Sequence, residues 1–127
     1  MENKEGLIWY DGNLVDWKDA KLHVLTHGLH YASSVFEGER SYSGRIFKLH
    51  EHTERLLYSA SELDFEIPYS IDEIKQASYL TLEKNNLVDA YIRPIAWRGA
   101  ETVGVSAQNT KIPVSYTHLR AHETGCY

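Results

Sequence analysis

The stretch from Leu29 to Tyr42 constrains this chain most, because it combines aromatic, glycine and arginine residues in a run whose pattern predicts a strand. Successive side chains of a strand point to opposite faces of the sheet. One face of the predicted strand over 35–42 therefore carries Phe36, Gly38, Arg40 and Tyr42. A gap at Gly38 between an aromatic ring and a cation suits a flat ligand that lies close to the backbone. The alternative is an ordinary half-buried strand with a glycine bulge.

The composition is that of an ordinary folded domain, with 127 residues of which 43% are hydrophobic and 24% charged. The 13 basic and 18 acidic side chains give a net charge of −5, and the basic residues do not cluster, so we expect no nucleic-acid partner. The polar start and the lack of a long apolar run predict neither secretion nor a membrane span, and we expect a cytoplasmic protein. A single cysteine, Cys126, agrees with a reducing compartment.

The rest of the chain predicts more strands and two helices. In chain order, the predicted elements are a hairpin over 7–17, a return strand over 45–49, a helix over 50–63, a helix from 70 to about 85, and a strand over 90–98. Ser70 and Glu73 have the spacing of a capping box, which marks the start of the second helix. Together these elements predict a soluble domain that contains both helices and strands.

Three histidines, His23, His27 and His30, have the spacing of metal ligands on a helix. The residues between them favour a helix poorly, and no carboxylate or cysteine completes a ligand set. We therefore interpret the histidines as hydrogen-bonding groups in loops and core, and we expect no metal site. Ser33 and Ser34 are interpreted as structural hydroxyls, because the spacing places no base beside them.

Arginines and phenols supply the chemistry that the sequence predicts most directly. The set consists of Arg40, Arg55, Arg93, Tyr31 and Tyr91. Guanidinium groups match the oxygens of carboxylates and phosphates in two-point geometry, and such charge-assisted bonds are roughly twice as strong as neutral ones. From its residues alone, the chain is predicted to bind a small, acidic and partly apolar ligand.

Three motifs carry a resemblance to a known family. They are the run from His30 to Arg40, the run from His52 to Leu56 with Ser59-Ala60, and the run from Ala90 to Pro94. In order and spacing they closely resemble the branched-chain amino acid aminotransferases of the class IV, pyridoxal-phosphate-dependent group. The likeness extends from about residue 7 to about residue 112. It implies an α+β fold, that of the small N-terminal domain of a class IV aminotransferase, with an antiparallel-rich sheet and two helices.

The resemblance implies an enzyme that moves the amino group of L-leucine, L-isoleucine or L-valine to 2-oxoglutarate with pyridoxal 5′-phosphate, in a homodimer or higher homo-oligomer. In this family the catalytic lysine lies in the larger C-terminal domain, and no lysine of this chain stands at a matching position. We therefore expect a truncated, inactive fragment. The alternatives are another class IV enzyme, such as a D-amino acid or (R)-amine transaminase or an aminodeoxychorismate lyase, and a non-catalytic anion-binding domain.

By position, the resemblance also implies roles for individual residues. Arg55 would bind the cofactor phosphate, and Arg93 would receive the distal carboxylate of glutamate. Tyr91 and Arg40 would help to hold the α-carboxylate. The pocket for the substrate side chain would be lined by Phe36 and Gly38 and, reaching into the partner subunit's site, by Tyr31 and Val105.

Two features depart from the family pattern. Family members often have an apolar residue where Glu39 stands, and because Glu39 faces away from Phe36 and Arg40 we expect this to affect local packing only. After Pro113 the resemblance stops, and residues 114–124 look like the translation of a transposase sequencing adapter. We therefore divide the chain into a domain over 1–113 and a non-native tail over 114–127 that carries no information on fold or metal binding.

Overall fold

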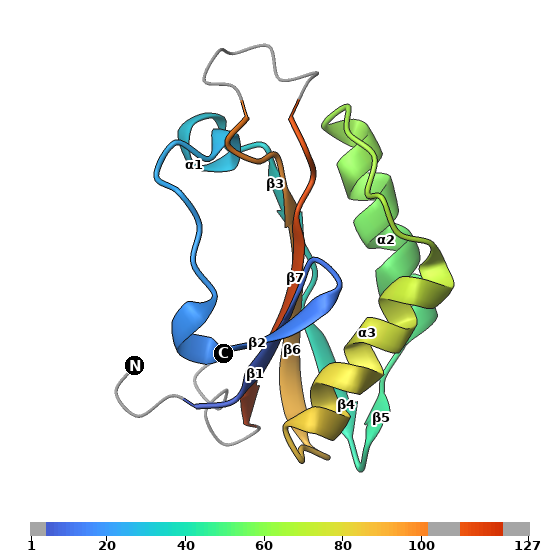
Figure 1. Ribbon diagram of the computed structural model, residues 1–127. Coiled ribbons are helices and arrows are strands. Elements are labelled where there is room, and N and C mark those ends of the chain that lie inside the picture. Colours follow the sequence, from blue (N-terminus) through green and yellow to red (C-terminus); the bar gives the residue numbers. More distant parts are fainter. Residues whose placement is uncertain (1–4, 102–109, 121–127) are drawn as a thin grey trace.

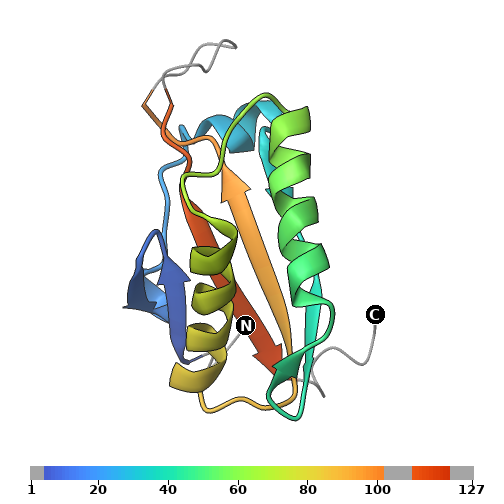
Figure 2. The same cartoon turned by 90° about the vertical axis from the view of Figure 1, so that its right-hand side faces the viewer.

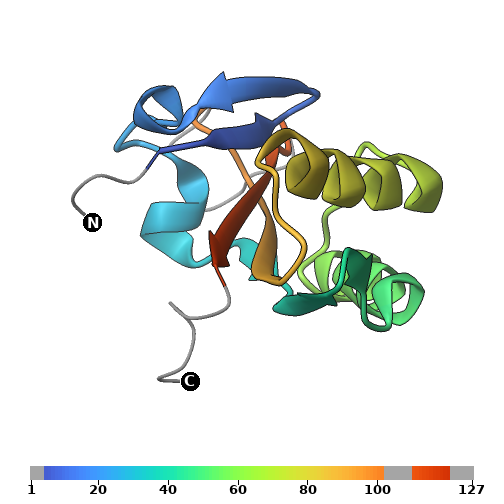
Figure 3. The same ribbon diagram turned by 90° about the horizontal axis from the view of Figure 1, so that it is seen from below.

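A single antiparallel sheet with two long helices on one face forms the body of the protein. The structure is a computed structural model that describes residues 5–101 and 110–120. The helices α2 (Leu49–Glu62) and α3 (Ile71–Lys84) cover one face, and the segment with the short helices η1 (Trp17–Asp19) and α1 (His27–Tyr31) lies on the other (Figures 1 and 3). Within the described residues, no helix is both long and apolar enough to cross a membrane.

The described part of the chain forms seven strands, joined in antiparallel pairs. They are β1 (Leu7–Tyr10), β2 (Asn13–Asp16), β3 (Ser34–Phe36), β4 (Glu39–Tyr42), β5 (Arg45–Ile46), β6 (Ala90–Trp97) and β7 (Val114–Arg120). Their order across the sheet is β2-β1-β7-β6-β4-β5, and β3 also pairs with β6. The predicted α+β class with an antiparallel-rich sheet is therefore confirmed.

Both predicted long helices are present within a residue or two of their expected ends. The capping box at the start of α3 is confirmed, because Glu73 N donates to Ser70 Oγ (3.1 Å) and Ser70 N donates to Glu73 Oε1 (2.9 Å). The side of α2 that faces the sheet includes Thr53 and Leu56, both fully buried. His52 lies at the edge of α2, and Leu63, just after its last residue, is exposed.

The stretch that was predicted as one strand over 35–42 is interrupted between β3 and β4. Phe36 pairs with Ile95 and Glu39 pairs with Ile92, so both strands hold the same register against β6 and no residue is inserted. The interruption lies opposite Pro94, which accepts a hydrogen bond from Glu37 N (3.1 Å) but has no N–H to donate in return. The alternative of a glycine bulge is therefore wrong. The strand is interrupted here because Pro94 has no N–H to donate.

The continuous register keeps the predicted alternation of side chains across the gap. Val35, Glu37, Glu39 and Ser41 are buried, on the face that α2 and α3 cover. Phe36, Gly38 and Tyr42 are exposed and Arg40 is half-buried, on the opposite face. We call that opposite side of the sheet, on which the described part of the chain places η1 and α1 but no long helix, the free face.

Residues after Pro113 form a central strand of the sheet. β7 pairs with β6 along its whole length and with β1 at Tyr116 and Ser115 (Figure 2). Val114 and Tyr116 are fully buried, and the Tyr116 ring meets the Trp9 ring edge-on with centroids 5.7 Å apart. The adapter origin of residues 114–127 stays a prediction, but residues 114–120 do have a place in this fold, because their alternating side chains fit a strand against the helices.

The buried face contains one carboxyl group in an unfavourable setting. Glu39 is 2% exposed, and among the described residues its Oε1 atom has no hydrogen-bond partner. Burial raises the pKa of the Glu39 carboxyl to about 8, and the negative charge of Glu37 adds to the shift. The carboxyl is therefore held in its protonated form near neutral pH.

We expect Tyr116→Ala to lower the free energy of unfolding by about 3–5 kcal/mol, because it removes a fully buried aromatic ring. Urea unfolding followed by circular dichroism measures this value. The matched control is Tyr42→Ala, which removes a ring that is 57% exposed and should cost less than about 1 kcal/mol. Equally small losses for the two variants would contradict the central position of β7.

We expect the stability of the chain to fall as the pH rises from about 4.5 to about 8, because the folded state keeps the Glu39 proton that the unfolded state loses near 4.5. Each unit of pKa difference corresponds to about 1.4 kcal/mol, so the loss should amount to several kcal/mol. Urea unfolding at several pH values measures it. In Glu39→Gln this part of the slope should vanish, whereas Glu54→Gln, at an exposed position, should keep it. Parallel pH profiles for wild type and Glu39→Gln would contradict the assignment.

Candidate functional site

The free face of the sheet brings several of the predicted site residues together at the β3–β4 edge. The common register places Phe36, Gly38 and Arg40 opposite Ile95, Arg93 and Tyr91. Side chains opposite one another on the same face of an antiparallel pair lie in contact range. Two aromatic rings, two guanidinium groups and one glycine thus form a compact group from three strands.

Arg93 is held between two aromatic rings in this group. Its Nε and Nη2 atoms donate hydrogen bonds to Tyr91 Oη at 3.1 and 2.7 Å. Its Cζ atom lies 4.1 Å from the centroid of the Phe36 ring. Stacking on a ring and a two-point hydrogen bond both fix the plane of a guanidinium group. Arg93 is therefore oriented before any ligand arrives.

Gly38 leaves the space that the Tyr91 side chain occupies. A Cβ atom at position 38 would lie 2.6 Å from Tyr91 Oη and 3.3 Å from two ring carbons. Any larger residue would displace the phenol that receives the Arg93 hydrogen bonds. The predicted gap on the free face is real, and the phenol of the neighbouring strand fills part of it.

Arg55 lies on the other side of the same strand edge. Its Nε and Nη2 atoms donate to the two carboxylate oxygens of Glu37 at 2.8 and 2.7 Å. His52 Nδ1 lies 2.8 Å from Glu37 Oε1. The Glu37 side chain is only 4% exposed, whereas the Arg55 side chain is 65% exposed. A buried carboxylate of the strand thus anchors an exposed guanidinium group of α2.

The charge state of Glu37 follows from its partners. Burial raises the pKa of the Glu37 carboxyl, but the hydrogen bonds and positive charges of Arg55 and His52 outweigh burial, and the net pKa lies below its usual value. The hydrogen bond and the negative charge of Glu37 in turn raise the pKa of the Arg55 guanidinium. Both groups are therefore ionised at neutral pH. Sequence reasoning missed this cluster, because helical periodicity does not show which strand residue a helix edge meets.

Two predicted site residues lie elsewhere. Tyr31 is the last residue of α1, where its ring packs against the His27 ring with centroids 4.6 Å apart. Val105 lies outside the described residues. The structure therefore brings together Phe36, Gly38, Arg40, Tyr91 and Arg93, places Arg55 across the strand edge from them, and leaves Tyr31 in a separate element.

The histidines act as hydrogen-bonding groups, as interpreted from the sequence. His27 Nδ1 and Ser33 Oγ lie 2.6 Å apart, and His30 Nε2 lies 3.0 Å from the Val24 carbonyl oxygen. His23 Nδ1 accepts a hydrogen bond from Leu25 N (3.0 Å). The pairing of Ser33 with a histidine had no signal in the residue spacing, and it ties α1 to the segment before β3. Among the described residues, no group of three or more histidine, cysteine, aspartate or glutamate residues could hold a metal ion.

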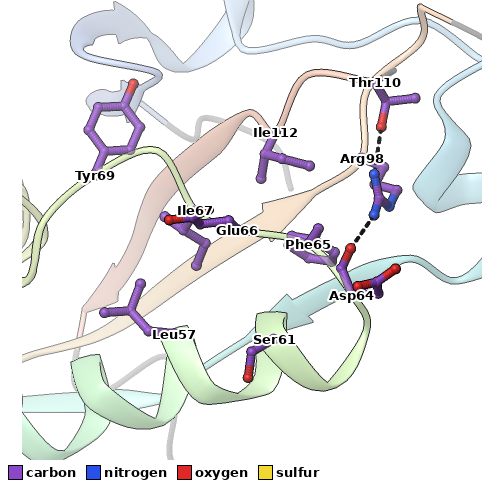
Figure 4. A pocket seen from close by; sticks show the side chains of 10 residues that line it. All are labelled: Leu57, Ser61, Asp64, Phe65, Glu66, Ile67, Tyr69, Arg98, Thr110 and Ile112. Carbon is purple, nitrogen blue, oxygen red and sulfur yellow. Dashed lines mark hydrogen bonds between the residues drawn. The ribbon is translucent and has the colours of Figure 1, made fainter. Parts of the chain in front are cut away.

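A cavity of about 770 Å³ lies between the end of α2 and the segment before β7 (Figure 4). Arg98 lies at one end, 6% exposed, and donates to the Asp64 carbonyl oxygen (2.5 Å) and to Thr110 Oγ1 (3.2 Å). It also lies over the Phe65 ring, 5.4 Å from the centroid. Arg98 thus links these segments, and among the residues that the structure describes the cavity shares none of its lining with the predicted site.

Comparisons with known proteins give a consistent result. The family described as amino-transferase class IV matches residues 34–125. The probable branched-chain-amino-acid aminotransferase of Rickettsia felis is 54% identical over 99 residues, which cover 78% of this chain and 34% of that protein. The branched-chain-amino-acid aminotransferase of Pseudomonas aeruginosa is 48% identical over 118 residues, 90% of this chain and 38% of that protein. The chain therefore spans little more than a third of the length of these curated relatives.

Solved structures show the same fold. The branched-chain amino acid aminotransferase of Escherichia coli matches with a TM-score of 0.88 and 39% identity, over 92% of this chain and 40% of that chain. A second solved branched-chain amino acid aminotransferase, complexed with N-(5′-phosphopyridoxyl)-L-glutamate, also matches with a TM-score of 0.88 and 39% identity, over 92% of this chain and 42% of that chain. Because the family match covers well over half of its residues, this chain belongs to the class IV aminotransferase family.

Proposed function

We propose that this chain is part of a branched-chain amino acid aminotransferase that uses pyridoxal 5′-phosphate and transfers the amino group of L-leucine, L-isoleucine or L-valine to 2-oxoglutarate. The names of its relatives support this reaction, and one solved relative holds pyridoxamine 5′-phosphate. The observation that carries the proposal is the pair of oriented guanidinium groups, Arg55 and Arg93, on the two sides of one strand edge. We further propose a cytoplasmic enzyme that works as a homodimer or higher homo-oligomer.

The residues around Arg55 fit the phosphate of this cofactor. Glu37 accepts hydrogen bonds from Nε and Nη2 on one side of the guanidinium group, and the Arg55 side chain is 65% exposed. The Nη1 hydrogens and one Nη2 hydrogen therefore remain for an anion, in the two-point geometry that phosphate oxygens accept. Pyridoxal phosphate, when bound, supplies a carbonyl that takes up the amino group and a ring that accepts charge when the α-proton leaves.

The group on the free face fits the two kinds of substrate. An apolar side chain can lie against the Phe36 ring, and the distal carboxylate of glutamate can pair with Arg93 at its edge. In the proposal, Arg40 and Tyr91 bind the α-carboxylate, and Tyr31 and Val105 reach into the partner subunit's site. Such a pocket accepts both leucine and glutamate. Because the cation lies at the rim of the apolar surface, it can stay in contact with water when leucine is bound.

The lysine that moves the α-proton is placed, in this proposal, in the part of the relatives that this chain does not cover. The chain's own residues then bind and orient the cofactor phosphate and the substrate carboxylates. A non-catalytic anion-binding domain is the alternative for these 127 residues taken alone.

A hybrid protein tests the proposal directly. Residues 1–113 of this chain, followed by the remaining C-terminal part of the Pseudomonas aeruginosa relative, should transfer the amino group of L-leucine to 2-oxoglutarate. Initial rates of glutamate formation measure this activity. We expect L-leucine to react at least about tenfold faster than D-alanine, because Arg93 beside Tyr91 and the run from Phe36 to Arg40 resemble the enzymes for L-branched-chain amino acids. Faster reaction with D-alanine would favour a D-amino acid transaminase and contradict the proposal.

In this hybrid, Arg55→Ala should weaken the affinity for pyridoxamine 5′-phosphate by roughly 10- to 100-fold, the range expected when a hydrogen-bonded charge pair is lost. Fluorescence titration of the cofactor measures the dissociation constant. Arg45→Ala, which removes an exposed arginine of β5, is the matched control and should leave the affinity unchanged. An unchanged affinity in Arg55→Ala would show that another group binds the phosphate.

A further inference from the structure

The contact between Glu37 and Arg55 has a geometry that matters for a phosphate ligand. The carboxylate accepts from Nε and Nη2, which form one side of the planar guanidinium group. The two-point contact fixes the plane of the group and leaves its outer end, with Nη1, toward solvent. The direction in which Arg55 can receive an anion is therefore set by Glu37.

Glu37 is itself held firmly. Its side chain is 4% exposed, its backbone N donates to the Pro94 carbonyl oxygen at 3.1 Å, and its Oε1 atom is shared by Arg55 and His52. His52 precedes Arg55 by three residues, so both side chains leave the same side of α2. One strand carboxylate thus joins two helix residues to the sheet edge.

An exposed arginine without such an anchor adopts many rotamers, and ordering it costs free energy when a ligand binds. The 65% exposed Arg55 side chain has few other constraints on its outer end. We propose that Glu37 is a positioning residue, which orders the Arg55 guanidinium so that its outer end is presented to a phosphate group. The inference rests on the proposed function, in which Arg55 binds the cofactor phosphate.

A positioning role and a purely electrostatic role of Glu37 predict opposite effects of its removal on the affinity for phosphate. Removing the negative charge of Glu37 makes the surroundings of Arg55 more positive, and charge alone would then tighten phosphate binding. Loss of positioning instead weakens it. We expect positioning to dominate, because the Arg55 side chain is 65% exposed and water and salt screen the effect of a change in nearby charge.

The test uses the full 127-residue chain and inorganic phosphate as the probe. Nitrogen-15 NMR follows the Arg55 Nε–H signal for its exchange with water, and the backbone amide signals of α2 for phosphate binding. In wild type the Nε–H signal should be protected from exchange, and the amide signals should shift with saturation during a phosphate titration. In Glu37→Gln the protection should be lost, and the affinity for phosphate at Arg55 should fall roughly three- to tenfold, as expected for ordering one flexible side chain. Glu54→Gln, an exposed carboxylate of α2 whose partner is His50, is the matched control and should change neither reading.

The outcomes separate this inference from the proposed function. Equal or tighter phosphate binding in Glu37→Gln would overturn the positioning role, even if Arg55→Ala abolishes binding. Undiminished binding in Arg55→Ala would instead overturn the phosphate assignment itself. Circular dichroism verifies that each variant is folded. If Glu37→Gln does not fold, Glu37→Asp replaces it: the shorter acid keeps the charge but cannot span the same contact, so affinity should still fall, and wild-type affinity would overturn the proposal.

Discussion

The register of β3 and β4 against β6 is the constraint on which the rest of the site depends. Both strands keep one alignment with β6, and the gap between them lies opposite Pro94, which lacks an N–H. The alternation of side chains therefore runs unbroken through the gap. Glu37 faces the helices and meets Arg55, whereas Phe36 and Gly38 face the opposite side and meet Arg93 and Tyr91. A shift of one residue would exchange the two faces and abolish both clusters.

Two carboxylates in the same extended stretch show how partners decide the fate of a buried charge. Glu37 and Glu39 are both nearly inaccessible and point to the same side of the sheet. Glu37 is bonded to Arg55 and His52, and its pKa lies below the usual value despite burial. Glu39 lies two residues further on, and burial raises its pKa to about 8. The first carboxylate anchors a candidate ligand-binding arginine, and the second reduces stability as the pH rises.

Local patterns in the sequence predicted much of this architecture. Alternation in 35–42, helical spacing after Leu49 and the Ser70–Glu73 capping box gave the faces of the strand and the two long helices. The arginines and aromatic residues of the free face were also predicted. Contacts between elements could not be predicted in the same way: neither the pairing of Glu37 with Arg55 nor that of His27 with Ser33 has a signal in spacing along the chain. The role of Pro94 could be recognised only from the register of the strands. The central position of β7 could be recognised only from the pairing of strands that are distant in sequence.

The central claim is that Arg55 and Arg93, on opposite sides of one strand edge, serve the two ends of a single ligand. N-(5′-phosphopyridoxyl)-L-glutamate and its L-leucine counterpart test it most directly, by isothermal titration calorimetry on the hybrid protein and its Arg93→Gln variant. We predict that Arg93→Gln weakens the glutamate compound at least about tenfold and leaves the leucine compound within about twofold, because only glutamate has a distal carboxylate. Equal affinities of wild type and variant for the glutamate compound would contradict the claim.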